Sequence, residues 1–335
     1  NGTRRSVDMD SKPRDPGTYY DRIAAHHVQP LWVETARYVP REPAPPYDPV
    51  LWKYEEIRPL LAEAGDVITP EEAGRRVLVL KNPALGDFGG TTRSLYACLQ
   101  LILPGERAAE HRHTQSAMRL VLEGDGAFTT VDGGRLEMQP GDFIITPSWA
   151  WHGHIHEGTT PMVWLDGLDN GLMAQLDTTF FEPGPPDGYI PGDDDTVAPR
   201  RARVLRYPYE DAREKLAALQ KAAPPDACLG YRMEYLDPSD GGPAMSTMTT
   251  ALTLLEKGFR GQPYRCSDGA IFTVLEGEGE TEIGGEIFAW KQHDVFVVPS
   301  WAPHSHRASA ESVLFGFSDR VVQQKLDVWR EARGA

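Results

Sequence analysis

The chain has 335 residues, with 34 Lys and Arg against 49 Asp and Glu, and therefore a formal net charge of −15 at pH 7. Its 40% hydrophobic and 25% charged residues exclude a mostly disordered protein, and its length favours roughly two domains. The negative charge argues against a nucleic-acid partner, because phosphate groups would be repelled. No apolar run approaches the roughly twenty residues that cross a bilayer, and the three cysteines are widely separated, which fits reduced thiols. We therefore expect a cytoplasmic protein with no nucleic-acid or membrane partner.

The predicted elements alternate between irregular, helical and β-rich segments. Residues 1–74 are predicted to form an extended arm and helical pieces, since VPREPAPPYDP must be irregular and LWKYEEIRPLLAEAG has helical spacing. Residues 75–185 hold short β-rich runs separated by Gly, Pro and Asp, the pattern of a β-sandwich or barrel. A breaker-rich linker and a helix are predicted over 186–222, and β-rich sequence resumes over 223–318. The last segment, 319–335, is predicted to be an amphipathic helix with apolar positions Val321, Val322, Leu326 and Trp329.

The two β-rich segments are copies of one another. AMRLVLEGDGAFTTVDGGRLEMQPGDFIITPSWAWHGH aligns with GAIFTVLEGEGETEIGGEIFAWKQHDVFVVPSWAPHSH almost without gaps. This alignment places His152 opposite His304 and His154 opposite His306. Two units of barrel size indicate a duplicated domain and not a solenoid.

Two histidine pairs in the first copy have the spacing of a strand face. His111 and His113 are two residues apart, as are His152 and His154, so each pair points to one side of its strand. A pair of strand histidines alone more often belongs to the core or the surface than to a metal site. If the barrel brings both strands together, however, three or four imidazoles converge, and imidazole binds Fe, Zn, Cu and Ni. No cysteine lies near them in the sequence, which argues against structural zinc.

The spacing G-x₅-H-x-H, followed by P-G-D and a further His, resembles the motif pair of the cupins. With the duplication, this resemblance implies a bicupin: an all-β fold with helical additions, made of two double-stranded β-helix (jelly-roll) barrels. Many cupins add a Glu ligand shortly after the second His, but Ala117 and Met118 occupy that zone here, so the implied metal ligands are His111, His113 and His152. The stretches HRHTQSAMR, PGDFIITPSW and WLDGLD resemble more narrowly the gentisate and salicylate 1,2-dioxygenases, which are ring-cleaving non-haem Fe(II) enzymes.

That family implies Fe(2+) as cofactor, a small aromatic ortho-hydroxycarboxylate and O₂ as substrates, and a homotetramer. Arg119 matches the family's carboxylate-binding Arg, although it could instead form a salt bridge at the barrel mouth. Asp166 is implied as an orienting partner, with a turn cap as the alternative. His154 is implied as a hydrogen-bond partner or proton shuttle.

Three further residues fall on the family's substrate-binding positions: Arg75, Gln100 and Tyr96. The sequence leaves open whether Arg75 or Arg76 faces the site, and the Gln100 amide could bond to the backbone instead of to substrate. Tyr96 resembles the gentisate enzymes more than the salicylate enzyme, for which the resemblance implies Trp.

The second copy lacks the ligand set. Tyr264 and Cys266 stand where His111 and His113 stand in the first copy, and only His304 remains, so we expect a metal-free scaffold. In the first copy, Gly153 stands where the family usually shows Asp.

The sequence thus predicts an Fe(II)-dependent dioxygenase that cleaves the aromatic ring between its carboxyl- and hydroxyl-bearing carbons, with gentisate as the first choice. Salicylate, a substituted salicylate or 1-hydroxy-2-naphthoate are alternative substrates. A non-catalytic ligand-binding bicupin is the alternative from another class.

Overall fold

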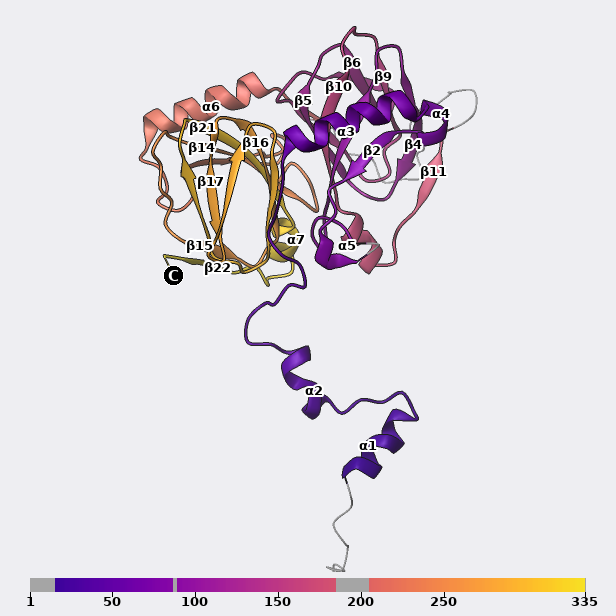
Figure 1. Ribbon diagram of the computed structural model, residues 1–335, viewed down its shortest axis with the longest axis vertical. Coiled ribbons are helices and arrows are strands. Elements are labelled where there is room, and N and C mark those ends of the chain that lie inside the picture. Colours follow the sequence, from indigo (N-terminus) through magenta and orange to yellow (C-terminus); the bar gives the residue numbers. More distant parts are fainter. Residues whose placement is uncertain (1–15, 87–88, 185–204, 335) are drawn as a thin grey trace, which may run out of the picture. The chain divides into compact units, whose positions relative to one another are not determined.

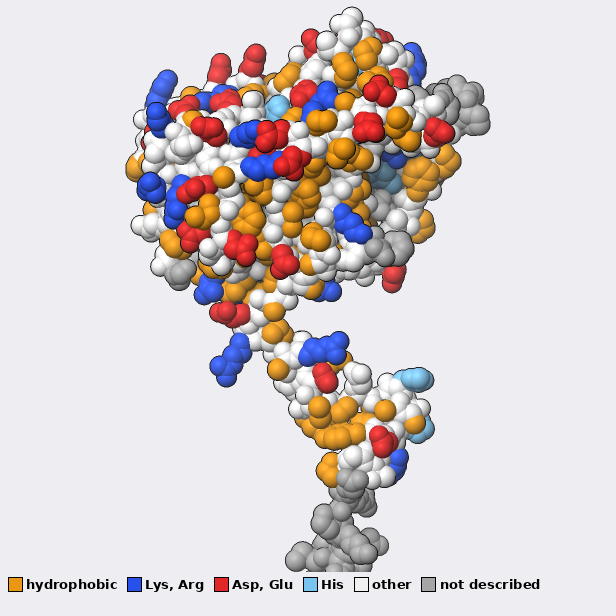
Figure 2. All heavy atoms as spheres, viewed as in Figure 1, with side chains coloured by type: hydrophobic (Ala, Val, Ile, Leu, Met, Phe, Trp, Pro, Cys, Tyr) orange, Lys and Arg blue, Asp and Glu red, His pale blue; other side chains and the backbone are white. Residues whose placement is uncertain are grey.

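The computed structural model describes residues 16–86, 89–184 and 205–334, and the chain divides into two compact units between Ala44 and Pro45. The described part of the first unit holds helices α1 (Pro16–Ala24) and α2 (Leu31–Tyr38), neither of which buries a residue. Apolar side chains lie on the surface of this unit (Figure 2), and Trp32 is 65% exposed. Among the described residues, no helix has both the length and the apolar character needed to span a bilayer.

The second unit contains two barrels, each built from a six-stranded and a five-stranded sheet (Figure 1). The first barrel has the sheet orders β12-β8-β5-β10-β3-β2 and β11-β4-β9-β6-β7. Its strands are β2 (Arg76–Val79), β3 (Tyr96–Ile102), β4 (Arg107–His113), β5 (Ala117–Glu123), β6 (Ala127–Val131), β7 (Gly134–Glu137), β8 (Phe143–Thr146), β9 (His152–His156), β10 (Met162–Leu168), β11 (Phe181–Pro183) and β12 (Arg206–Tyr207).

The second barrel repeats this plan with the sheet orders β1-β19-β16-β21-β14-β13 and β18-β17-β20-β15-β22. Its strands are β1 (Val50–Trp52), β13 (Tyr231–Glu234), β14 (Thr249–Leu255), β15 (Tyr264–Cys266), β16 (Ala270–Glu276), β17 (Glu278–Ile283), β18 (Glu286–Lys291), β19 (Val295–Val298), β20 (His304–Ala308), β21 (Ser312–Ser318) and β22 (Glu331–Arg333). The helical additions are α3 (Tyr54–Val67), α4 (Pro70–Ala73), the short 3₁₀ helix η1 (Pro83–Leu85), α5 (Asn170–Gln175), α6 (Tyr209–Ala222) and α7 (Arg320–Lys325).

The two halves exchange their first strands. β1 precedes the first barrel in sequence but pairs with β19 of the second, and β12 precedes the second barrel but pairs with β8 of the first. The predicted boundaries at residues 74 and 186 therefore separate strands from the sheets that they complete. The part of the predicted linker over 186–204 lies outside the described residues.

Each exchanged strand leads into a helix, and the first turn of that helix is bound by the barrel whose sheet the strand joins. Asp142, from the P-G-D turn of the first barrel, accepts a hydrogen bond from the backbone N–H of Tyr209 (3.0 Å) and pairs with Arg206 (2.8 Å). Asp294 of the second barrel does the same for the N–H of Tyr54 (2.8 Å), which begins α3. A carboxylate at a helix N-terminus satisfies free N–H groups and complements the helix dipole.

One hydrophobic core joins the two barrels. β5 and β21 are almost entirely buried because each strand is covered on both sides. Alternate side chains of β5, such as Leu120, enter the shared core, where the rings of Phe143 and Phe315 lie 5.5 Å apart. The intervening residue Val121 packs inside the first barrel with Trp164. The strand pairing thus selects which side chains of β5 face the inside of the barrel.

The predicted C-terminal helix is wrong beyond Lys325. α7 has six residues, Asp327 adopts a left-handed backbone conformation (φ 58°), and β22 then pairs with β15. The same sequence of a short helix, a left-handed Asp177 (φ 54°) and an edge strand occurs as α5 and β11 in the first barrel. The chain end therefore completes the second barrel.

Candidate metal centre

The structure brings three of the four predicted histidines into one cluster. β4 carries His111 and His113, β9 carries His152, and the pairing of the two strands sets His111 directly against His152. The ring centroids of these two residues are 4.1 Å apart, and His113 lies 4.7 Å from His152 and 5.6 Å from His111. One ligand nitrogen from each ring lies within 4.8 Å of the other two. No other group of this kind occurs among the residues that the structure describes.

Main-chain carbonyls orient all three rings. Nδ1 of His111 bonds to the carbonyl of Ala109 (3.0 Å), and Nδ1 of His113 to that of Gln115 (2.9 Å). Nδ1 of His152 bonds to Ala150 in the same way, at 2.9 Å. A carbonyl oxygen only accepts, so each Nδ1 carries the hydrogen and each Nε2 presents a lone pair. Three lone pairs gathered inside a buried site fit a divalent transition-metal ion, which would take the place of the hydrogen bond that Arg75 donates to Nε2 of His111.

Burial keeps these rings neutral. It lowers the pKa of His111 to about 3 and that of His113 to about 4, and the nearby Arg75 guanidinium adds to both effects. Burial and the Arg119 charge lower the pKa of His152 well below its usual value. At neutral pH all three rings are therefore uncharged, with a hydrogen on Nδ1 only, and the neutral ring is the form that binds a metal.

The opposite wall of the barrel carries a buried ion pair. Arg119 on β5 is paired with Asp166 on β10, where their Nε and Oδ1 atoms lie 3.3 Å apart, and Arg119 also donates to the Thr146 hydroxyl. The Trp164 indole N–H donates to the other oxygen of Asp166 (3.0 Å). Burial raises the pKa of Asp166 and lowers that of Arg119, while the charge of each partner opposes the shift of the other's pKa. The alternative of Asp166 as a turn cap is wrong, since its side chain belongs to this pair.

Arg75, and not Arg76, faces the site. An Nη atom of Arg75 contacts Nε2 of His111, whereas Arg76 is held by Glu106 (2.6 Å) and by the carbonyl of Ile68 (2.8 Å). Both arginines that the sequence singled out, Arg75 and Arg119, therefore place positive charge next to the histidine cluster.

The remaining predicted contacts lie along β3. Gln100 is buried and pairs with Trp164 of β10, and Cys98 pairs with Asp166. Tyr96 has the same parity at the start of the strand and is half-buried. These three side chains alternate along the face of β3 that bears toward Asp166. Sequence reasoning missed Thr146 and Trp164, which hold the ion pair. The only signal for them in the sequence is that both occupy strand positions whose side chains face the inside of the barrel.

His154 differs from its counterpart in the second barrel. Its ring is fully buried, packs 5.0 Å from the Trp164 ring, and has no hydrogen-bond partner for either nitrogen among the described residues. The counterpart, His306, bonds to the Thr281 hydroxyl at 2.8 Å. Thr129, which corresponds to Thr281, bonds to the carbonyl of Gly153 instead (3.0 Å). The two repeats therefore differ here, since a hydroxyl holds the His306 ring and no side chain or main-chain group among the described residues holds that of His154.

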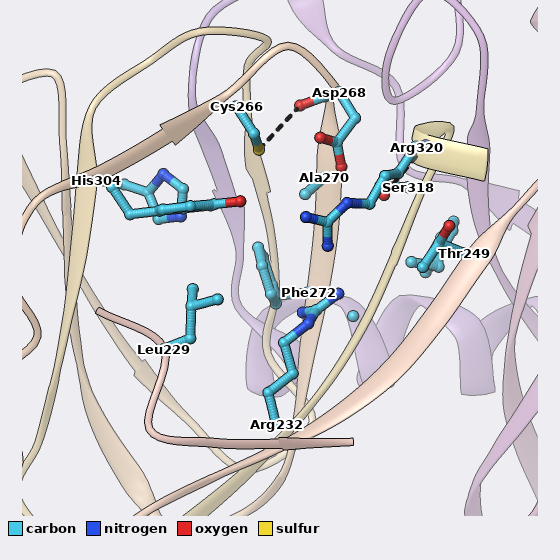
Figure 3. A pocket seen from close by; sticks show the side chains of 13 residues that line it. Leu229, Arg232, Thr249, Cys266, Asp268, Ala270, Phe272, His304, Ser318 and Arg320 are labelled. Atoms are coloured by element: carbon cyan, nitrogen blue, oxygen red, sulfur yellow. Dashed lines mark hydrogen bonds between the residues drawn. The ribbon is translucent and has the colours of Figure 1, made fainter. Parts of the chain in front are cut away.

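The second barrel lacks the ligands for the same chemistry. Tyr264 is bonded to Glu331 (2.9 Å), and burial raises the pKa of the Cys266 thiol well above its usual value. Figure 3 shows Arg232 and Arg320 pointing into the space beside Cys266. The cavity left there has a volume of about 30 Å³, which is enough for about one water molecule.

Comparisons with known proteins agree with this geometry. The model of the Cupin domain family matches residues 98–167 and 251–315. Gentisate 1,2 dioxygenase 1 of Aquipseudomonas alcaligenes is 46% identical over 338 residues, covering 94% of this chain and 95% of that protein. 5-Aminosalicylate 1,2-dioxygenase of Comamonas sp is 33% identical, covering 96% of this chain and 91% of that protein.

A solved structure shows the same fold. The salicylate 1,2-dioxygenase of Pseudoaminobacter salicylatoxidans, in an adduct with gentisate, superimposes with a TM-score of 0.87 at 30% identity, covering 98% of this chain and 97% of that one. The two cupin barrels, the buried histidine cluster and these relatives together place the chain in the gentisate/salicylate 1,2-dioxygenase family of bicupins, the ring-cleaving dioxygenases.

Proposed function

We propose that this protein is an Fe(II)-dependent dioxygenase that cleaves gentisate between its carboxyl- and hydroxyl-bearing carbons. The observation that carries the proposal is the set of three inward-facing Nε2 atoms of His111, His113 and His152 with two arginines beside it. The 46% identity to a gentisate 1,2-dioxygenase supports the choice of substrate.

Ferrous iron bound by the three Nε2 atoms would supply a redox-active Lewis acid that activates dioxygen together with the aromatic substrate. Three neutral ligands leave the ion its full charge of +2, which suits a chelating carboxylate and phenolate. Both atoms of O₂ enter the ring-opened product, so the reaction needs no external reductant.

The protein's own residues bind and orient the substrate. Arg75 and Arg119 supply guanidinium groups for the substrate carboxylate, and Asp166 and Thr146 hold Arg119 in place. Burial lowers the pKa of His154 well below its usual value, so this ring suits the role of a hydrogen-bond partner for a substrate hydroxyl and not that of a proton shuttle. Gln100 and Tyr96 lie on the strand that would line the ring-binding side, and the buried walls exclude water from the reaction.

A substrate panel tests this proposal. We expect oxygen uptake with gentisate after anaerobic loading with Fe(II), a matching loss of gentisate, and no uptake with hydroquinone, which lacks the carboxylate for the arginines. Faster turnover of salicylate, 5-aminosalicylate or 1-hydroxy-2-naphthoate would reassign the substrate and keep the reaction. If no ortho-hydroxybenzoate supports uptake by the loaded protein, the non-catalytic binding protein is the better description. Loading with Zn(II) or Mn(II) in parallel identifies the active metal.

We further propose a cytoplasmic homotetramer. The three described cysteines are free and buried, in keeping with a reducing compartment. Exposed apolar side chains in residues 16–44, such as Trp32, support association between copies of the chain. Light scattering coupled to size-exclusion chromatography tests the oligomeric state; a monomer at micromolar concentration would contradict it.

A further inference from the structure

The barrel wall behind the metal ligands contains an irregularity. The pairing of β4 with β9 jumps from Ala108↔His154 to His111↔His152, so that Gly153 faces two residues of β4 instead of one. A bulge of this kind leaves main-chain groups without their usual cross-strand partners. The bulge lies directly beside the pair His111 and His152, where a mobile backbone would let the two rings move apart.

A series of hydrogen bonds through two side chains bridges this bulge on the outer face of the barrel. The N–H of Gly153 donates to the Thr130 hydroxyl (3.1 Å), and that hydroxyl donates to the Glu110 carboxylate. The carbonyl of Gly153 in turn accepts from Thr129 (3.0 Å). Both polar groups of the Gly153 peptide are therefore held, and β4, β9 and β6 are tied together at one point.

The bridge leaves little room for a side chain at position 153. A Cβ atom there would lie 3.0 Å from Cδ of Glu110 and 3.0 Å from the carbonyl oxygen of Ala108, which is closer than such contacts normally allow. The Glu110 carboxylate thus occupies the space that a side chain at 153 would fill.

The second barrel provides an internal comparison. The residues at the positions of Glu110, Thr130 and Gly153 are Pro263, Glu282 and Ser305, as the pairing of Glu282 with Ser305 and of Tyr264 with His304 shows. Proline there offers no carboxylate, and Glu282 instead pairs with Arg307 (2.8 Å). The bridge is therefore present in the barrel with three histidines and missing from the barrel without them.

We infer that Glu110 and Thr130 are positioning residues for the metal centre, which act through the Gly153 peptide to fix His111 and His152 in the spacing that one ion needs. The inference deepens the proposed function and rests on its metal site. Thr129 also bonds to the Gly153 carbonyl, and His154 has no hydrogen-bond partner among the described residues.

The test measures Co(II) binding by visible absorption, together with the melting temperature of each metal-free variant. We expect Thr130→Val, which removes only the hydroxyl, and Glu110→Ala each to weaken Co(II) binding by about 10-fold or more, as for other residues that support metal ligands. Thr130→Ser and Glu110→Gln keep the required donor and acceptor and should restore most of the affinity. The double variant should lose no more Co(II) affinity than the single variant with the larger loss, because both residues act through one bridge.

Glu282→Ala is the matched control, since it removes a carboxylate from the corresponding strand of the second barrel and should leave Co(II) binding unchanged. Unchanged binding in Thr130→Val and Glu110→Ala would overturn the inference, as would equal losses in Thr130→Ser and Thr130→Val. If Glu110→Ala does not fold, the Thr130 pair decides. Failure of the unaltered protein to bind Co(II) would instead contradict the proposed metal site.

Discussion

The three imidazoles of the cluster have their Nδ1 hydrogens held by the main chain, as has His304 at the corresponding position of the second barrel. Each Nδ1 is bound to a main-chain carbonyl two residues away, at Ala109, Gln115 and Ala150. Ala109 lies in β4, and Gln115 and Ala150 lie just outside β4 and β9, so the backbone in and beside these strands sets the orientation of the rings. Such preorganisation lowers the entropic cost of binding.

Because of this geometry, we expect each ring of the cluster to be essential for iron binding. The residue at the corresponding position of the second barrel should be dispensable for it. We expect His152→Ala to lose tight binding of Fe(II) and all ring cleavage, because two imidazoles remain and one side of the ion opens to water. His304→Ala, at the corresponding position of the second barrel, should bind iron as the unaltered protein does. Metal content after gel filtration distinguishes the two; retention of one tightly bound Fe(II) per chain by His152→Ala would remove this residue from the centre.

At the residue scale, the sequence predicted the histidine cluster better than its surroundings. The i, i+2 spacing and the motif were sufficient for His111, His113 and His152, because both are properties of neighbouring residues. The choice between Arg75 and Arg76 needed the start of β2 to within one residue, which sequence patterns do not give.

Among the elements, α6 depends on a residue far away in the sequence. Its first backbone N–H is bound by Asp142, 67 residues earlier, and its own flanking residue Pro208 provides no side-chain cap. The P-G-D turn of the first barrel thus stabilises the helix that begins the second half. The motif that suggested a metal-binding barrel also joins the two repeats.

We expect Asp142→Ala to lower the free energy of unfolding by about 2 kcal/mol, near the upper end for a lost helix cap, because the partly buried ion pair with Arg206 is lost as well. Asp142→Asn keeps an acceptor for the Tyr209 N–H and should lose less. Asp125→Ala, at an exposed position of the same barrel, is the control. Urea denaturation measures all three; equal midpoints for Asp142→Ala and the control would show that the cap contributes nothing.

The elements that the sequence did not predict are the short ones. β1 and β12 have three and two residues, too few to show a period of two, so their exchange between barrels left no pattern. The C-terminal segment did carry a signal: QLD at 175–177 and KLD at 325–327 follow the two barrels at the same offset. Extending the repeat that far would have predicted β22 in place of a longer helix.

On the scale of the whole molecule, the shared core makes both barrels one cooperative structure that contains many buried neutral imidazoles. Burial lowers the pKa of His304 to about 4 and that of His306 to about 3, in addition to the cluster in the first barrel. These groups bind protons more readily when the chain is unfolded, near pH 6.5. Their contribution to stability is complete above that pH and is lost as the pH falls toward 4.

Four acids, Glu110, Asp166, Asp169 and Asp319, act in the opposite direction, because burial raises the pKa of each. Burial raises the pKa of Asp169 and of Asp319 to about 6, so the folded state binds protons more readily at these positions and gains stability as the pH falls from 6 toward 4. The histidines outnumber them and have shifts that are at least as large. The net effect of acid is therefore destabilising.

We expect the free energy of unfolding of the metal-free protein to decrease steadily between pH 7 and pH 5, with His304 alone contributing up to about 3 kcal/mol by pH 4. Urea denaturation at half-unit pH intervals measures this decrease. His304→Asn removes one titrating ring and leaves the histidine cluster unchanged. Below pH 6, the slope of its unfolding free energy against pH should therefore correspond to about one proton fewer taken up on unfolding. Stability that stays level or rises on acidification would mean that the acids outweigh the histidines, and that the barrels tolerate charge where their burial argues against it.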